Sequence, residues 1–223
     1  MILALDFDSI LHSNYFIAKK FGEIDEWKMF NTMCSVIAKI KNEVAVNRMC
    51  TAVLCVDGAN SWRKKYLLSY KATRSKEGKE DYFKLKEDVL NRFREYEFIL
   101  RQEGMEADDW IALLSEYSGE TCIVTSDKDM LQLVSDKTTF YNYRTKQLLT
   151  INEIDGEYEE WSKIILGCKS DNIPKCVKGR FGPKAFDKLF NDYIIYDNLN
   201  DFKSLDFDQL EITKIITRTH IEL

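Results

Sequence analysis

Residues Thr121–Asp127 read TCIVTSD, a short apolar run that is rich in β-branched residues and is soon followed by an acid. The same arrangement occurs in MILALD, from Met1 to Asp6, and in AVLCVD, from Ala52 to Asp57. Continuously apolar runs of this length are typical of strands that are buried on both faces, as in a parallel sheet. We therefore expect three buried strands, each delivering its acid to the carboxyl edge of one sheet, where ligands bind in such folds.

Helical patterns alternate with these runs. In Asp25–Met49 apolar residues recur every three or four positions, which predicts an amphipathic helix. Further helices are expected at Tyr82–Leu100, Ala107–Tyr117 and Glu157–Leu166, and weaker strands at Thr139–Tyr143 and Gln147–Ile151. This order predicts the α/β class, with a central, mostly parallel sheet that is flanked by helices.

The composition fits one α/β domain with a small appendage, because 45% of the 223 residues are hydrophobic. No apolar run approaches the roughly 20 residues of a membrane-spanning helix, and Asp6 interrupts the apolar start too early for a signal peptide. We expect a cytoplasmic protein that does not bind membranes. The six cysteines include no C-x-x-C pair, so neither a disulfide framework nor a zinc site is expected.

The charges are unevenly distributed along a chain whose net charge is −5. Residues Ser61–Lys86 include nine Lys or Arg and three Asp or Glu, and residues Lys163–Lys188 include seven and two. An acidic body with two basic segments is the layout expected when carboxylates hold a metal and basic residues hold phosphates. Two solvated, lysine-rich helix faces would give the same pattern, so charge alone does not decide.

Further acids accompany the three strand ends: Glu106, Asp108, Asp109, Asp129 and Asp171. Each has a structural explanation, since Asp is a preferred N-cap residue and acids are favoured in the first turn of a helix. Together, however, carboxylates at one sheet edge repel each other unless cations lie between them. Oxygen ligands without His or Cys partners suit Mg²⁺ or Mn²⁺, and two such ions about 4 Å apart can clamp a phosphodiester.

Other chemistries lack their signatures. There is no G-x-x-x-x-G-K-[ST] loop and no G-x-G-x-x-G loop, and neither His12 nor His220 lies in a catalytic motif. Metal-assisted phosphodiester hydrolysis is the reaction that remains.

Four motifs resemble the flap endonuclease and 5′-3′ exonuclease family. VLCVD at Val53–Asp57, with WR at Trp62 and YKATR at Tyr70–Arg74, resembles its second acidic motif and basic arch. EADD at Glu106–Asp109 and TSDKDMLQL at Thr125–Leu133 are similar to two further acidic motifs. Gly167–Phe186 resembles the start of its helix-three-turn-helix element, and LDFDSI, from Leu5, is most similar to the phage ribonuclease H branch. The order and spacing of all four agree over nearly the whole chain.

The resemblance implies a PIN-like and flap-endonuclease-like core at residues 1–156, with a basic helical arch at about 61–88. It implies a helical DNA-binding subdomain with a helix-three-turn-helix at residues 157–223. The expected activity is structure-specific 5′ nuclease activity, exonucleolytic or at flaps, with ribonuclease H activity on RNA primers. The implied partners are branched or nicked duplex DNA, 5′ flaps and RNA–DNA hybrids, together with a replication protein, and the chain is expected to be a monomer.

The resemblance also assigns residues. Asp6, Asp57, Glu106 and Asp108 would hold a first Mg²⁺, Asp127 would lie between two ions, and Asp109, Asp129 and Asp171 would serve the second, with Mn²⁺ able to substitute. Lys71 and Arg74 would contact the scissile phosphate, so that Lys71, Arg74 and Asp127 are the catalytic residues. The DNA contacts would come from Arg63, Lys64, Lys71, Arg74, Lys175, Lys178, Gly179, Arg180, Gly182 and Lys184, with a K⁺ ion at the helix-three-turn-helix loop.

The sequence departs from the family at Cys168, where relatives usually have Asp. A neutral thiol is a poor ligand for Mg²⁺, so the second ion would be weakened or would be Mn²⁺. Two alternatives stay open: a non-catalytic, structure-specific DNA-binding protein, and a PIN-type ribonuclease, which shares the acidic edge but would not be expected to carry the basic arch. The charges from Arg63 to Lys86 have no obvious intramolecular partners, so the arch is expected to be disordered without substrate.

Overall fold

The computed structural model describes residues 1–75, 78–195, 197, 199 and 204–217. Two compact units form the chain, residues 1–61 with 76–154 and residues 62–75 with 155–223. Residues 76–77 of the predicted arch, and residues 218–223 with several positions between 196 and 203 of the predicted C-terminal subdomain, lie outside the described residues.

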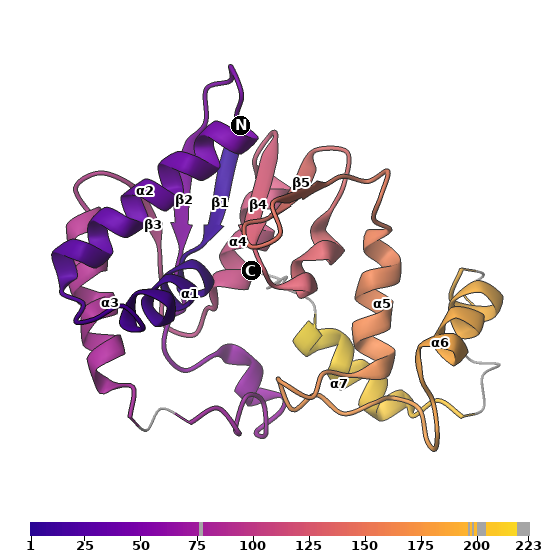
Figure 1. Ribbon diagram of the computed structural model, residues 1–223. Coiled ribbons are helices and arrows are strands. Elements are labelled where there is room, and N and C mark those ends of the chain that lie inside the picture. The colour runs from indigo at the N-terminus through magenta and orange to yellow at the C-terminus, as the bar shows by residue number, and fades with distance from the viewer. Residues whose placement is uncertain (76–77, 196, 198, 200–203, 218–223) are drawn as a thin grey trace. The chain divides into compact units, whose positions relative to one another are not determined.

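The first unit is built on a six-stranded sheet in the order β3-β2-β1-β4-β5-β6 (Figure 1). The strands are β1 (Ile2–Asp6), β2 (Thr51–Cys55), β3 (Phe98–Leu100), β4 (Thr121–Thr125), β5 (Thr138–Asn142) and β6 (Gln147–Leu149). Every pairing is parallel except that of β6 with β5. The predicted fold class is confirmed, and the switch point of the sheet, where ligands bind in such folds, lies between β1 and β4.

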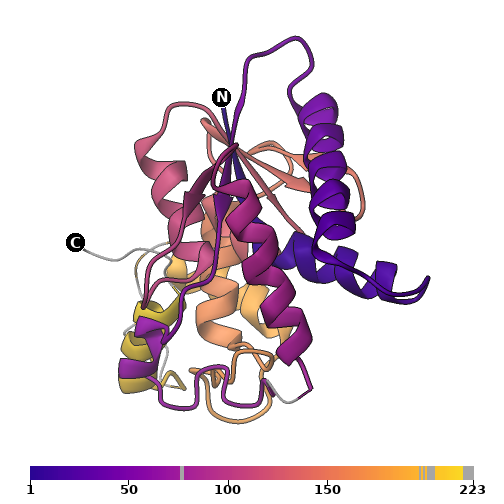
Figure 2. The same ribbon diagram turned by 90° about the vertical axis from the view of Figure 1, so that its left-hand side faces the viewer.

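Helices cover both faces of this sheet, as the turned view shows (Figure 2). One face packs against α1 (Phe7–Lys19), α2 (Glu26–Val44) and α3 (Glu80–Phe93), and the other against α4 (Ala107–Tyr117) and the 3-10 helix η2 (Lys128–Leu133). Alternate side chains of β1 pack into opposite cores: Leu3 and Leu5 belong to the core on the first face, and Ala4 belongs to the core on the second. Burial on both faces explains why the central strands are apolar throughout.

Two elements differ from the sequence prediction. The helix expected to reach Leu100 ends at Phe93, and residues Phe98–Leu100 form β3, paired in parallel with Val53–Cys55 of β2. The prediction was wrong because the apolar spacing continues past the helix end, and only pairing with a distant strand reveals the change. Helix α1 was not predicted, although Asp6 caps its first turn and four of its apolar side chains are buried.

The second unit has its own core. The elements of this unit are the short 3-10 helix η1 (Trp62–Lys65), α5 (Gly156–Leu166), α6 (Pro183–Leu189), a π-helical turn at Phe190–Ile194, and α7 (Phe207–Thr217). Ile164, Phe186 and Leu210 are among the side chains buried in this core. Gly167 ends α5 with φ +70°, and a Cβ there would lie 2.5 Å from the Ile173 carbonyl oxygen, so the turn requires glycine. The helix-three-turn-helix stays a prediction.

Candidate active site

Asp6 lies at the junction of β1 and α1 and is the centre of the acidic edge. One carboxylate oxygen accepts the Ser9 N–H at 3.0 Å, which caps α1, and the other accepts the Thr125 hydroxyl at 2.6 Å. The side chain is buried, and burial, opposed by these two hydrogen bonds and reinforced by Asp57 and Asp8, raises the pKa of Asp6 from 3.8 to about 7. A nearby cation would stabilise the ionised form of this buried carboxylate.

Asp57 is held from both of its sides. Its backbone N–H donates to Asp8 at 2.8 Å, and its carboxylate accepts the Ala107 N–H at 2.8 Å, at the first turn of α4. The other oxygen of Asp8 pairs with the ammonium group of Lys86, a buried residue of α3. The sequence did not reveal that Asp8 pairs with Lys86, since the two residues are 78 positions apart.

The EADD motif forms the start of α4. Glu106 is the buried N-cap residue, Asp108 is half-buried, and Asp109 is fully buried with its carboxylate 2.8 Å from the Glu106 N–H. The structural explanation considered for these acids therefore holds for Asp109, which stabilises the helix start. Its role at a second metal stays a prediction.

Asp127 and Asp129 follow β4. Asp127 is exposed and caps η2 by accepting the Asp129 N–H at 3.0 Å, while its own N–H donates to the Thr125 hydroxyl oxygen at 3.0 Å. Thr125 thus connects Asp127 to Asp6 through one hydroxyl group. Within the described part of the first unit, no three carboxylates have oxygens all within 4.8 Å of one another. The donors at this edge are carboxylate oxygens, which are the ligands that a hard divalent cation prefers. Among the residues that the structure describes, no Lys or Arg forms an ion pair with Asp6.

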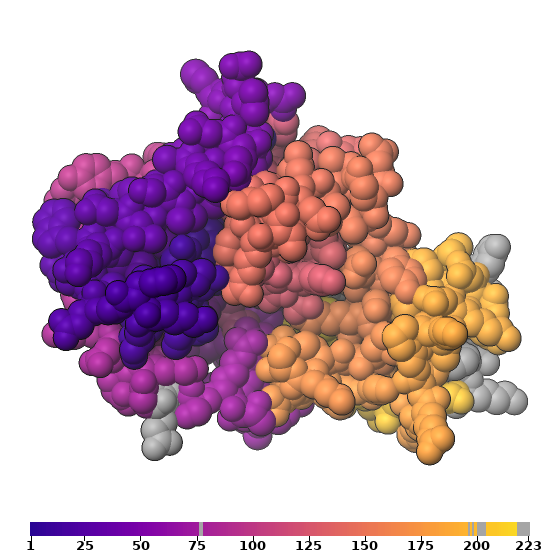
Figure 3. All heavy atoms as spheres, in the orientation of Figure 1, coloured from indigo at the N-terminus to yellow at the C-terminus, as the bar shows by residue number. Residues whose placement is uncertain are grey.

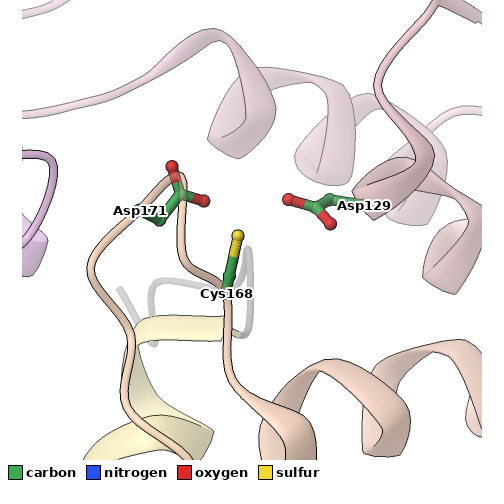
Figure 4. Close-up of side chains that lie close together, drawn as sticks. All are labelled: Asp129, Cys168 and Asp171. Carbon is green, nitrogen blue, oxygen red and sulfur yellow. The ribbon is translucent and has the colours of Figure 1, made fainter. Parts of the chain in front are cut away.

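In the second unit, Asp171 lies in the loop that follows α5. The loop is closed by a bridge between Cys168 and Ile173, and Figure 4 shows the Cys168 and Asp171 side chains on it. The Asp171 carboxylate is buried and lies 2.7 Å from the Arg74 guanidinium and 3.6 Å from the Lys163 ammonium. Two cations therefore compensate this one acid.

The predicted phosphate contacts lie in different surroundings. Lys71 has φ +52° and holds its ammonium group 5.0 Å from the centre of the Tyr70 ring, while its N–H donates to the Asp171 carbonyl oxygen at 3.0 Å. Arg63 is buried, and its Nε donates to the Ile216 carbonyl oxygen at 2.9 Å. That burial does not fit a direct contact with DNA, so Arg63 is better explained as a residue that fixes η1 to α7.

The remaining predicted DNA contacts are accessible, since Lys64, Lys175, Lys178, Gly179, Arg180 and Lys184 are exposed and Gly182 is half-buried. Lys175 donates to the Phe181 carbonyl oxygen at 2.6 Å, and Gly179 has φ +83°. Gly182 is the N-cap of α6, with Pro183 in the first turn. The partners of Arg63, Arg74 and Lys86 show that the expectation of an arch without intramolecular partners was wrong for these residues.

A mostly parallel sheet with carboxylates at its switch point is an arrangement that suits a metal-dependent nuclease. The family model of the 5′-3′ exonuclease N-terminal, resolvase-like domain matches residues 1–159. The chain therefore belongs to the 5′-3′ exonuclease family, and the predicted family and class of enzyme are confirmed.

Relatives and solved structures agree with this assignment. A 5′-3′ exonuclease of Buchnera aphidicola subsp. Schizaphis graminum is 27% identical over 92% of this chain and 76% of its own length. A 5′-3′ exonuclease of Bacillus subtilis is 34% identical over 46% of this chain, which is 38% of that protein.

Two solved structures have the same fold. The flap endonuclease of bacteriophage T5, in complex with DNA and metal ions, is similar with a TM-score of 0.71 and 18% identity, over 98% of this chain and 90% of that chain. The catalytic core of Rad2 with DNA substrate has a TM-score of 0.51 and 13% identity, over 99% of this chain and 73% of that chain. Among the described helices, none is long and apolar enough to cross a membrane.

Proposed function

We propose that the chain hydrolyses phosphodiester bonds near the 5′ end of DNA or RNA, with divalent metal ions as cofactors. The observation that carries this proposal is the carboxylate row at the β1 and β4 strand ends, in a chain of the 5′-3′ exonuclease family. The burial of Asp6 beside Asp57 and Asp8 supports it, because this unfavourable negative charge is what a bound cation would relieve.

The proposed ligands follow the motifs. Asp6, Asp57, Glu106 and Asp108 would hold a first Mg²⁺, Asp127 would lie between two ions, and Asp109, Asp129 and Asp171 would serve the second. Bound ions would activate water and stabilise the leaving oxygen. The chain's own residues set the geometry: the Thr125 hydroxyl orients Asp6, and the Ala107 N–H orients Asp57. Mn²⁺ is proposed to substitute for Mg²⁺.

Lys71 and Arg74 are proposed to contact the scissile phosphate. A lysine provides a compact point charge and an arginine provides a planar fork, which together suit the non-bridging oxygens as charge develops on them. Arg74 pairs with Asp171 in the second unit, so phosphate binding by Arg74 would exchange one anion for another.

The loop from Lys175 to Lys184 is proposed to hold the duplex part of the substrate. Its exposed Lys and Arg side chains would give contacts that are independent of sequence and weaken with salt, and its glycines allow close approach of a phosphate backbone. A K⁺ ion at this loop belongs to the same proposal. The proposed substrates are 5′ flaps, nicked or branched duplexes and RNA–DNA hybrids, and the proposed state is a monomer that meets a replication protein in the cytoplasm.

Digestion of end-labelled substrates tests the proposal. A 5′-flap duplex, a nicked duplex and an RNA-primed duplex would be incubated with Mg²⁺, with Mn²⁺ and with a chelator, beside Asp127→Ala. We expect release of short 5′ products that requires metal and is lost in the variant. Binding of all three substrates without cleavage in either metal would favour the non-catalytic binding protein. Preferential cleavage of single-stranded RNA would favour a PIN-type ribonuclease.

A further inference from the structure

A cavity of about 700 Å³ opens in the first unit between α1, α2 and the turn that joins β5 to β6. Figure 3 shows this face, where the indigo atoms of α1 and α2 adjoin the salmon atoms of the β5–β6 region. None of the predicted metal ligands or DNA contacts lines it. Its volume is in the range of a site for a small ligand, so the cavity is large enough for a nucleotide.

The charged side chains that line the cavity are three cations, Lys39, Arg144 and Lys146. One carboxylate, that of Glu43, lies 3.9 Å from the Lys39 ammonium and 3.3 Å from the Lys146 ammonium. Arg144 forms no ion pair with an acid in the part of the chain that the structure describes; its Nε donates to the Tyr143 hydroxyl at 3.3 Å. An excess of positive charge therefore faces the cavity, in a chain whose net charge is negative.

The wall contributed by α1 carries aromatic and apolar side chains beside the polar Ser13 and Asn14. Phe16 and Ile17 line the cavity with 41% and 54% of their surface exposed, although both are large hydrophobic residues. The His12 ring lies 4.6 Å from the Phe16 ring, and burial, together with Lys79 and Arg144, lowers the pKa of His12. The His12 ring is tilted by 55° to the Phe16 ring, so a planar base can stack on one of the two rings while the other contacts its edge.

The cavity is joined to the acidic edge through the Tyr143 side chain. Tyr143 donates its hydroxyl to the Ser9 carbonyl oxygen at 2.9 Å, and the Ser9 N–H donates to the Asp6 carboxylate at 3.0 Å. Both groups belong to the first unit, so the link lies within one compact unit.

We propose that this cavity is a second nucleotide site, which holds a base on Phe16 and His12 and a phosphate on Arg144 and Lys146. Exposed aromatic and apolar side chains, together with a guanidinium that forms no ion pair among the described residues, suit a ligand that is aromatic at one end and dianionic at the other. The ligand is a nucleotide unit, either a free nucleoside monophosphate or one nucleotide of a single strand. This inference does not depend on cleavage, because binding is measured without metal.

Calorimetry in a chelator, with the full chain, tests the site. The probes are adenosine 5′-monophosphate, adenosine, inorganic phosphate, a single-stranded hexanucleotide and an acidic hexapeptide. We expect the wild type to bind the monophosphate more tightly than it binds adenosine or phosphate. Compared with the wild type, Arg144→Gln should bind the monophosphate about tenfold more weakly, and Phe16→Ala at least fivefold more weakly. Arg48→Gln, which removes an exposed cation paired with Glu120 outside the cavity, should leave binding unchanged.

Each outcome decides. Binding of the monophosphate and the hexanucleotide with equal affinity assigns a free nucleotide, and binding of the hexanucleotide alone with the same two losses assigns a strand. Equal losses in Arg144→Gln and Arg48→Gln would mean non-specific attraction and would overturn the proposal. So would binding that neither Arg144→Gln nor Phe16→Ala weakens, or a hexapeptide that binds as tightly as the nucleotide.

Discussion

The hydroxyl group of Thr125 donates to the Asp6 carboxylate at 2.6 Å. The Thr125 hydroxyl oxygen also accepts the Asp127 N–H at 3.0 Å. One fully buried side chain at the end of β4 therefore positions two of the predicted metal ligands. Because β1 and β4 are neighbours in the sheet, this contact crosses the switch point. The fold therefore positions Asp6 and Asp127 through one shared hydroxyl group.

Thr125→Val should weaken both catalysis and folding. Valine keeps the shape of threonine but leaves Asp6 without its shortest hydrogen bond, which stabilises the ionised form. We expect a loss of about 1–2 kcal/mol in the free energy of unfolding and at least a tenfold lower cleavage rate at pH 7. Urea denaturation and single-turnover cleavage measure the two effects. Thr125→Ser should restore the rate; a variant that folds and cleaves like the wild type would show that the hydroxyl does not position Asp6.

Stability without metal should fall as pH rises. The pKa of Asp6 is about 7 in the folded chain and 3.8 ordinarily, so between these values the folded state binds more protons than the unfolded state. The contribution of Asp6 to the free energy of unfolding is fully present below about pH 4 and is lost as pH rises through 7. The loss is on the order of 2–4 kcal/mol. Urea midpoints in a chelator at pH 5 and pH 8 measure this loss.

Two comparisons check that the pH dependence of stability arises from Asp6. Asp6→Asn cannot ionise, so its midpoint should change less between the two pH values than that of the wild type. Added Mg²⁺ should restore wild-type stability at pH 8 and should do little at pH 5, since protons and metal ions compete for the carboxylate. The same pH dependence in Asp6→Asn would contradict the assignment.

Removing Lys86 should destabilise the loop that carries Asp57. Lys86→Met leaves Asp8 as a largely buried acid without its cation, and Asp8 accepts the Asp57 N–H at 2.8 Å. We expect a loss of about 2–4 kcal/mol in the free energy of unfolding. The double variant Lys86→Met with Asp8→Asn should recover much of that loss, because no uncompensated charge remains. Additive losses in the double-mutant cycle would mean that the two residues do not act as a pair.

Cys168 should govern the metal preference if the second ion is weak. Replacing the thiol by a carboxylate in Cys168→Asp restores an oxygen ligand close to Asp171 in the same loop. We expect half-maximal cleavage at a Mg²⁺ concentration several-fold lower than in the wild type, with a smaller advantage of Mn²⁺. Cys168→Ser is the matched control, since it adds no charge. Superimposable titration curves for wild type and Cys168→Asp would refute the hypothesis.

The central strands could be predicted from sequence because burial on both faces leaves a local mark, an apolar run that ends in an acid. The three acids at the ends of β1, β2 and β4 followed from the same pattern. Strand β3 could not be predicted, since three residues carry no periodicity and Phe98 is two thirds exposed. Pairings between distant residues were also hidden, among them Lys86 with Asp8 and Arg74 with Asp171. Sequence identified which residues are charged, and only the fold shows which charges are already compensated.

The most direct test of the central claim is the single-turnover rate of 5′-flap cleavage in Mg²⁺ by the wild type, Asp6→Asn and Asp127→Asn. Lys128→Gln is the control, because Lys128 is exposed, adjoins Asp127 and has no proposed role. We expect a loss of at least a hundredfold in both Asn variants with little change in substrate binding, and a near wild-type rate for Lys128→Gln. Cleavage by either Asn variant at the wild-type rate would contradict the central claim.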